Sequence, residues 1–398
     1  MVEATYVIGN GFDIHLGLKT SYKDFYKYLD EQIDKGNFKD NHLINDIKKD
    51  LEDSIKDLYF GGVPNEPDEL SPDERSLVDW SNLEAGVTQD LKRLVKNQIT
   101  SEETITRIRE FHKLSQCLSK YLSSQNVPAK LNVNREEATQ GILGPISKLP
   151  LENWTSLRNA IIKRNTEIMD QNLKRRCDIN FVNFNYTDTL DQYLSQVDRI
   201  DNPFLRGITY GGGIATINKK ILHPNGTFAE TPVVGVGRAE DIPKELPIQN
   251  SDKIFLSKLD FAKHRKDFRV PNTYKALKDS DITVIYGMSI GKSDAVYFDQ
   301  IIEGMISNPH KYVIIVQFEK AYGLNLLGPD IFKEEEDIQN ELIDSYALIH
   351  VNESHLDEKT KNQIRDRIFV EFDNDPSSYF PFEMKEKQET PQTSHTAN

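Results

Sequence analysis

The sequence predicts an α/β fold, in which helices flank a parallel β-sheet. A first strand is expected from Glu3 to Gly9, where β-branched and aromatic residues run into a glycine-containing turn. Residues 282–287 and 312–317 are continuous apolar runs, which are typical of central parallel strands covered on both faces. Residues 293–305 between them have a helical pattern and complete a β-α-β unit. Together these features predict a Rossmann-like parallel sheet flanked by helices, with a large helical insertion after the first strand.

The predicted insertion begins just after the first turn. Thr20 or Ser21 is the expected N-cap of its first helix, and Asp24 lies in the first turn of that helix. Helical periodicity then recurs, with breaks, over most of the following 150 or so residues. The last segment is rich in Lys, Glu, Gln, Thr and Ser, which favours a disordered tail. The expected organisation is a Rossmann-like core over residues 1–19 and 176–380, a mainly helical insertion over 20–175, and a disordered tail over 381–398.

Composition and charge exclude several classes of protein. The chain has 398 residues and a formal net charge of -14, which argues against a broad basic face for non-specific nucleic-acid binding. Its two cysteines, Cys117 and Cys177, match no metal-ligand spacing and fit a reducing compartment. There is no signal-peptide pattern at the N-terminus and no apolar run of membrane-spanning length. We therefore expect a cytoplasmic protein that does not associate with a membrane.

Four polar clusters follow predicted strands. Gly9-Asn10-Gly11-Phe12-Asp13 ends the first strand, and Asn185-Tyr186-Thr187-Asp188 follows an apolar strand over residues 177–184. His223 ends a short apolar strand, and the fourth cluster contains Gly287, Ser289, Gly291, Ser293 and Asp294. Because the carboxyl ends of parallel strands lie along one edge of a sheet, these clusters are expected to meet in a single crevice, where α/β sheets bind their ligands.

Each cluster also has a purely structural interpretation. Thr187 or Asp188, and likewise Ser293 or Asp294, can serve as helix N-caps. His223 can be a structural histidine, and a glycine turn can connect a strand to a helix without any ligand. These alternatives remain open on the sequence alone.

Several of these motifs resemble a known family. Gly9-Asn10-Gly11-Phe12-Asp13, followed by Gly17-Leu18, Thr20, Tyr22 and Phe25, is similar to the opening signature of the AbiH family of bacteriophage abortive-infection proteins. Trp80-Ser81-Asn82-Leu83-Glu84, Asn183-Phe184-Asn185-Tyr186-Thr187, and Tyr286 to Gly291 with Asp294 resemble its later blocks. The resemblance covers roughly residues 4–320 and implies a bacterial cytoplasmic protein that blocks phage propagation.

A more distant resemblance concerns the chemistry. The order of glycine turn, Asn-Tyr after a strand, His after a strand, and Gly-x-Ser is similar to the Sir2-like NAD-binding fold. This resemblance implies that Asn185 positions the nicotinamide ribose and that His223 acts as a base. It also implies that Ser289 and Asp294 lie near the adenosine, with the turn from Gly9 to Asp13 beside the phosphates. The zinc-binding cysteines of the deacylating relatives are missing, so we do not expect protein deacylation.

The first hypothesis is therefore an effector that cleaves NAD or a related nucleotide at the glycosidic bond without a metal. Breaking this bond develops positive charge on the ribose. Asn185 would orient the ribose and water, His223 would accept a proton, and Asp13 or Asp188 would offset the charge. The remaining predicted nucleotide-binding residues are Gly9, Asn10, Gly11, Phe12, Tyr186, Asp188, Gly287, Ser289 and Asp294.

Two alternatives belong to other functional classes. Asp13, Asp188 and Asp294, with Glu84, could bind Mg²⁺ in a metal-dependent nuclease effector. A sensor that binds a nucleotide without turning it over is the third hypothesis. In each case we expect a nucleotide ligand, a phage-derived trigger or a partner defence protein, and a possible homo-oligomer.

Overall fold

The computed structural model describes residues 2–37, 41–44, 81–125, 131–167, 177–197, 199–202, 205, 214–228, 235–318, 328–351, 356–373 and 379–384. Within these residues the strands are β1 (Val2–Ile8), β2 (Leu131–Asn132), β3 (Cys177–Asn183), β4 (Arg199–Asp201), β5 (Ile214–Ile217), β6 (Ile282–Tyr286), β7 (Tyr312–Phe318), β8 (Ile368–Asp373) and β9 (Glu383–Met384). The helices of the first half are α1 (Gly11–His15), α2 (Tyr22–Asp34), α5 (Ser81–Lys96), α6 (Ser101–Ser124), α7 (Arg135–Ser147) and α8 (Leu151–Glu167). The later helices are α9 (Thr189–Leu194), η3 (Ala239–Asp241), α10 (Asn250–Lys253), α11 (Lys258–His264), α12 (Arg269–Asp279), η4 (Lys292–Asp294), α13 (Ala295–Ser307), α14 (Gly328–Ile349) and α15 (Glu358–Arg365).

Seven of the described strands form one sheet in the order β4-β5-β3-β1-β6-β7-β8. Every neighbouring pair is parallel except β4 with β5, at one edge. Without β4, this is the 3-2-1-4-5-6 order of a doubly wound sheet, in which the chain builds one half outward from β1 and then returns to build the other. The α/β class and the parallel sheet predicted from the sequence are confirmed.

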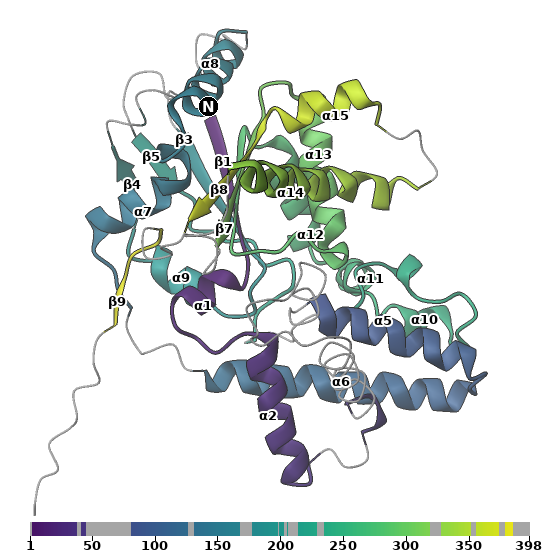
Figure 1. The fold of residues 1–398 in the computed structure, drawn as a ribbon. Helices are drawn as coiled ribbons and strands as arrows, with labels where there is room; N and C mark the ends of the chain where they lie inside the picture. The colour runs from purple at the N-terminus through teal and green to yellow at the C-terminus, as the bar shows by residue number, and fades with distance from the viewer. Residues whose placement is uncertain are drawn as a thin grey trace, which may run out of the picture.

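The central strand is buried on both faces. Tyr6 and Ile8 of β1 belong to a core with Ile142 of α7 and Leu157 of α8, whereas Val7 belongs to a core on the opposite face. This alternation follows from the two-residue period of a strand. Helices α12, α13, α14 and α15 cover one face, and α7, α8 and α9 lie on the other (Figure 1). The continuous apolar runs in the sequence are explained by these two helical layers.

The insertion after β1 divides between two cores. Phe25 of α2, Leu91 of α5 and Leu118 of α6 pack together, and they also pack against Val236 and Leu256 from the later part of the chain. Helices α7 and α8 pack instead on the sheet. In Figure 1, α2, α5 and α6 lie beyond the end of the sheet where β1 meets α1. Part of the insertion is therefore placed next to the carboxyl edge of the strands.

Some details differ from the sequence-based expectations. Residues 381–384 were assigned to the tail, but Glu383–Met384 pair antiparallel with β2 as strand β9. The strand expected near residues 219–223 is reduced to a single bridge between Leu222 and Val182. The sequence also predicts short strands at 207–210 and 232–235 and an amphipathic helix over residues 43–55. These segments fall wholly or largely outside the described residues, as does Trp80. Within the part of the chain that is described, no helix is both long enough and apolar enough to cross a bilayer.

The turns that follow β1 and β6 touch each other through their backbones. The Gly9 N–H donates to the Tyr286 carbonyl at 3.0 Å, and the Gly11 N–H donates to the Gly287 carbonyl at 2.7 Å. A Cβ on Gly9 would lie 2.5 Å from the Gly287 oxygen, and one on Gly11 would lie 2.6 Å from the Gly287 Cα. Gly287 has φ of +62°, in the left-handed region. Glycine is therefore required here by contact between the two turns.

We predict that Gly287→Ala destabilises the protein more than Gly17→Ala. Both glycines have positive φ, but a Cβ at 287 would lie 2.8 Å from the Phe12 nitrogen, whereas a Cβ at 17 has nothing within 4 Å. The Gly17 variant should lose about 1 kcal/mol of unfolding free energy from backbone strain, and the Gly287 variant roughly twice that or more. Urea denaturation measures both. Equal losses would contradict the importance of the contact.

Candidate active site

A cavity of about 300 Å³ lies at the carboxyl ends of β1, β3 and β6. The turns after these strands supply most of its wall, and Leu122 of α6 and Lys258 of α11 close it from outside the sheet. The lining residues are Gly9, Asn10, Gly11, Asp13, Ile14, Thr20, Leu122, Phe184, Asn185, Tyr186, Thr187, Asn225, Lys258, Gly287, Met288, Ser289, Gly291, Ser293 and Asp294. The cavity therefore lies where the strand order of the sheet reverses, the usual ligand position in such folds.

The glycine turn lines the cavity, but several of its N–H groups donate hydrogen bonds to carbonyl groups of the protein. The N–H groups of Gly9 and Gly11 bond to the turn after β6, and that of Phe12 donates to the Gly9 carbonyl at 3.0 Å. The side chain of Asn10 is also engaged, because its amide donates to the Thr20 carbonyl at 3.0 Å and its oxygen accepts from the Thr20 hydroxyl at 2.7 Å. These hydrogen bonds hold the turn in place.

Asparagine side chains hold the turn after β3. The Asn185 N–H donates to Asn183 Oδ1 at 3.1 Å, and Asn185 Nδ2 donates to the Gly9 carbonyl at 3.0 Å. These bonds fix the Asn185 side chain against the first turn. Asn225 Nδ2 donates to the Phe184 carbonyl at 3.3 Å, and its buried Oδ1 accepts no hydrogen bond from the described residues. A buried polar atom in this state is expected to meet a ligand or water.

Asp13 is the acidic side chain enclosed at the base of this wall. It is 1% exposed, and its Oδ2 accepts a hydrogen bond from the Thr187 hydroxyl at 2.6 Å. Oδ1 is buried as well. Burial raises the pKa of Asp13 to about 7, although hydrogen bonds from the hydroxyls of Thr187 and Thr189 act in the opposite direction. A carboxyl group with a pKa near neutrality can exchange protons with a substrate or water.

A lysine and an aspartate form a charged pair in another part of the cavity wall. Lys258 is 6% exposed, and its Nζ lies 4.0 Å from Asp294 Oδ1. The backbone positions Lys258, because its N–H donates to the Val236 carbonyl at 2.9 Å and Ser257 caps the short helix that starts there. The cavity therefore combines an ammonium group with carboxylates and amides.

Three residues of the predicted site do not line the cavity. Phe12 is fully buried and packs edge-on against Phe380, with ring centroids 5.3 Å apart. Asp188 precedes α9 and accepts a hydrogen bond from Gln192 at 3.2 Å. His223 turns its Nε2 toward the carboxylate of Asp191, 3.1 Å away. These side chains follow the predicted strand ends but point away from the shared crevice.

The other predicted site residues all line it: Gly9, Asn10, Gly11, Asp13, Asn185, Tyr186, Gly287, Ser289 and Asp294. Sequence reasoning missed Lys258, Asn225, Thr20 and Leu122. The Pro-Asn-Gly turn was a usable signal for Asn225, whereas Lys258 follows no strong motif and enters the wall through tertiary packing. Among the described residues, the three aspartates of the nuclease hypothesis do not form a group with ligand atoms within 4.8 Å of one another.

Comparison with known proteins gives a single result. A family model described as "Bacteriophage abortive infection AbiH" matches residues 5–316. This range includes β1, β3 and β6 and every residue that lines the cavity. No curated protein and no solved structure matches the chain.

We predict that Asp13→Asn gains stability relative to the unmodified protein as the pH rises. A carboxyl pKa raised by folding means that the folded state binds more protons than the unfolded state between about pH 4 and pH 7, so stability falls across this window. Asparagine carries no charge, so its advantage should grow by about 2 to 3 kcal/mol between pH 5 and pH 8. Thermal unfolding of both proteins at pH 5 and at pH 8 measures this difference in stability. Glu336→Gln, at an exposed position of α14, is the control and should show no such trend.

Proposed function

This chain belongs to the AbiH family of bacteriophage abortive infection proteins, and we propose that it exerts this defence by cleaving NAD or a related nucleotide at the glycosidic bond. The observation that carries the proposal is the placement of Asp13. Its carboxyl group is buried in the cavity wall, has a pKa near neutrality, and lies in the same wall as Asn185 and Asn225. Such a group, in a crevice at the switch point of a parallel sheet, is typical of an active site.

The chemistry assigned to this wall is hydrolysis of the bond between the ribose C1′ and the nitrogen of the base. In this reaction the carbon–nitrogen bond breaks, the base leaves with the bonding electrons, and a water oxygen bonds to C1′. The ionised Asp13 stabilises the positive charge on the ribose and accepts the proton of the water. Asn185 and Asn225 supply hydrogen bonds to the ribose hydroxyls. His223 is directed at Asp191, so we assign the role of base to Asp13.

Lys258 supplies the contact for the anionic part of the nucleotide. The N–H groups of Gly9, Gly11 and Phe12 already have acceptors in the protein, so they do not cradle a phosphate. Lys258 is the ammonium group that lines the cavity, and it is nearly buried. An ammonium group in a partly desolvated site binds phosphate strongly. A volume of about 300 Å³ is at the lower end for small-molecule sites and suits one nucleotide half of a dinucleotide.

The nuclease hypothesis lacks a comparable observation. Asp13 and Asp294 line the cavity, but Asp188 does not. The ammonium group of Lys258 lies beside Asp294, which disfavours binding of Mg²⁺ by this carboxylate. A metal-dependent nuclease would instead degrade nucleic acid in a manner sensitive to EDTA.

We predict that Lys258→Gln weakens binding of ADP-ribose roughly tenfold or more, because it removes a charged hydrogen bond to phosphate. Binding of adenosine, which has no phosphate, should change little. Isothermal titration of the purified chain with both compounds measures the difference. Lys263→Gln is the matched control, because Lys263 lies on the same helix with 72% of its side chain exposed. Equal losses for ADP-ribose and adenosine would contradict the phosphate contact.

The experiment that tests the cleavage compares the unmodified protein with Asp13→Asn. Purified protein is incubated with NAD, with and without EDTA, and nicotinamide is quantified by chromatography. We expect release that is insensitive to EDTA, that increases as the pH passes about 7 because the carboxylate is the active form, and that falls about 100-fold in the variant. Asn185→Ala should also lower the rate.

The same variants are compared in cells, because abortive infection takes place in cells infected by phage. NAD and nucleic acids are measured before and after phage infection in cells that produce each form. If the unmodified protein protects the cells against phage while their NAD and related nucleotide levels stay unchanged, the proposal is overturned. Protection accompanied by degraded nucleic acid would support the nuclease alternative.

A further inference from the structure

Helices α13 and α14 bring three potential metal ligands together on the outer layer of the fold. Asp299 and Glu303 are four residues apart on α13, so they lie on the same face of that helix. His350 directly follows the C-terminal end of α14. Its Nε2 lies 2.9 Å from Asp299 Oδ1 and 3.8 Å from Glu303 Oε1. Among the described residues, this is the group of His, Cys, Asp and Glu side chains close enough to share one ion.

We propose that Asp299, Glu303 and His350 form a binding site for a divalent transition-metal ion such as Zn²⁺. The three ligand atoms all lie within 4.8 Å of one another. In a tetrahedral zinc site with bonds of about 2.0 to 2.2 Å, neighbouring ligand atoms are roughly 3.3 Å apart. The distance from His350 to Asp299 would lengthen by a few tenths of an ångström, and that from His350 to Glu303 would shorten by about half an ångström. The oxygens of Asp299 and Glu303, which are at most 4.8 Å apart, would also have to reach this spacing, and we expect side-chain rotations to bring about these adjustments.

The second oxygen of each carboxylate has its own partner. Asp299 Oδ2 accepts a hydrogen bond from Gln300 Nε2 at 3.0 Å, and Glu303 Oε2 pairs with the ammonium group of Lys278. The oxygens Oδ1 and Oε1 therefore face His350, while Oδ2 and Oε2 are held from outside. The His350 ring stacks on Tyr346, with centroids 4.1 Å apart and an interplanar angle of 20°. Outer contacts of this kind orient the ligands of metal sites.

The site is open on one side. The Asp299 side chain is 4% exposed, whereas those of His350 and Glu303 are 16% and 27% exposed. A metal ion could therefore enter from the surface and keep a water as its fourth ligand. None of the three residues lines the cavity at the end of the sheet, so this proposal does not depend on the nucleotide chemistry. A bound ion would join the end of α14 to α13, the helix that begins directly after Asp294.

The experiment uses the full chain and ZnCl₂ as the probe. The protein is dialysed against EDTA and then against buffer, and zinc binding is measured by isothermal titration and by elemental analysis after equilibrium dialysis. We expect one zinc ion per chain, together with a higher Tm, because an ion that binds only the folded state stabilises it. Magnesium, tested in parallel, should bind at least ten times more weakly, since it disfavours an imidazole ligand.

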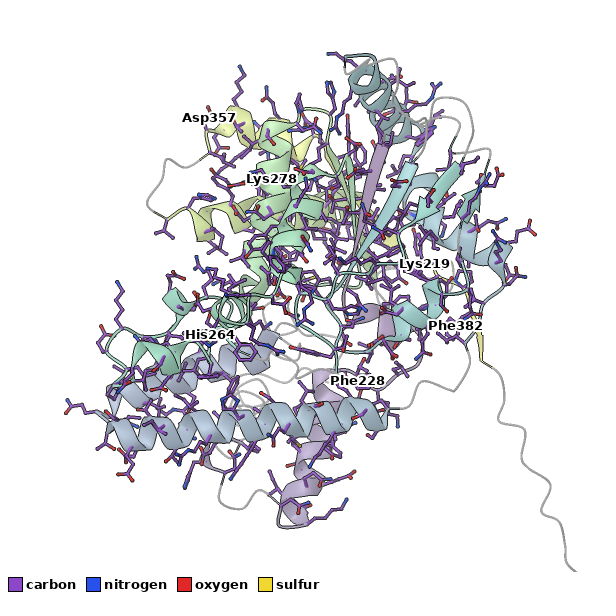
Figure 2. All side chains as sticks on the ribbon, turned by 180° about the vertical axis from the view of Figure 1, so that it is seen from behind. Lys219, Phe228, His264, Lys278, Asp357 and Phe382 are labelled. Atoms are coloured by element: carbon purple, nitrogen blue, oxygen red, sulfur yellow. The ribbon has the colours of Figure 1, made fainter. Side chains whose placement is uncertain are left out.

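Variants distinguish a metal site from a simple ion-pair network between the helices. Glu303→Gln and His350→Gln should each weaken zinc binding roughly tenfold or more. Lys278→Met should weaken zinc binding less than either ligand substitution, because this lysine contacts the oxygen of Glu303 that faces away from His350. His264→Gln is the control for adventitious binding, since His264 is exposed and lies away from Lys278 (Figure 2).

Circular dichroism without metal establishes that each variant is folded, and Asp299→Asn replaces any ligand variant that is not. The proposal is overturned if zinc does not bind at a saturable site, or if binding survives both ligand substitutions. It is also overturned if magnesium binds as tightly as zinc.

Discussion

The contact between the turns after β1 and β6 is the constraint on which the site depends. Gly9 and Gly11 meet Gly287 backbone to backbone, and no side chain fits between them. This contact fixes the separation of the two strand ends and so forms one wall of the cavity. In this close packing the N–H groups of Gly9, Gly11 and Phe12 already have acceptors within the protein. A glycine-rich turn that looks like a phosphate cradle is here a structural joint between two loops.

The chemical character of the cavity depends on the side chains of its wall, because the contact between the two turns occupies backbone N–H groups. Polar function has to come from side chains, and those of the wall include asparagines, hydroxyl groups, the enclosed carboxyl group of Asp13, the carboxylate of Asp294 and the nearly buried Lys258. Burial favours the neutral form of the Asp13 carboxyl group, whereas the ammonium group of Lys258 attracts anions. A ligand with a sugar at one end and a phosphate at the other would satisfy both, which is why a nucleotide is the substrate class that we favour.

The sequence predicted the central strands well because their signals are local. Each central strand is an apolar run covered on both faces, and parallel topology then brings the strand ends together. Strands β4, β5 and β8, which lie at or next to the edges of the sheet, were not predicted, because they are short or are specified mainly by the neighbours with which they pair. Side-chain direction was the other limit. Phe12 and His223 follow strand ends as expected, but packing turns one into the aromatic core and the other toward Asp191. Lys258 reaches the cavity from a distant part of the chain, which no local pattern indicates.

The two hydrogen bonds between Asn10 and Thr20 have a consequence for how this protein can diversify. They tie the turn after β1 to the segment that leads into α2, the first long helix of the insertion. Leu122 extends the same connection from α6 into the cavity wall. The outward faces of α2 and α6 can therefore change in sequence without altering the cavity, whereas the positions that face inward are held by their packing contacts.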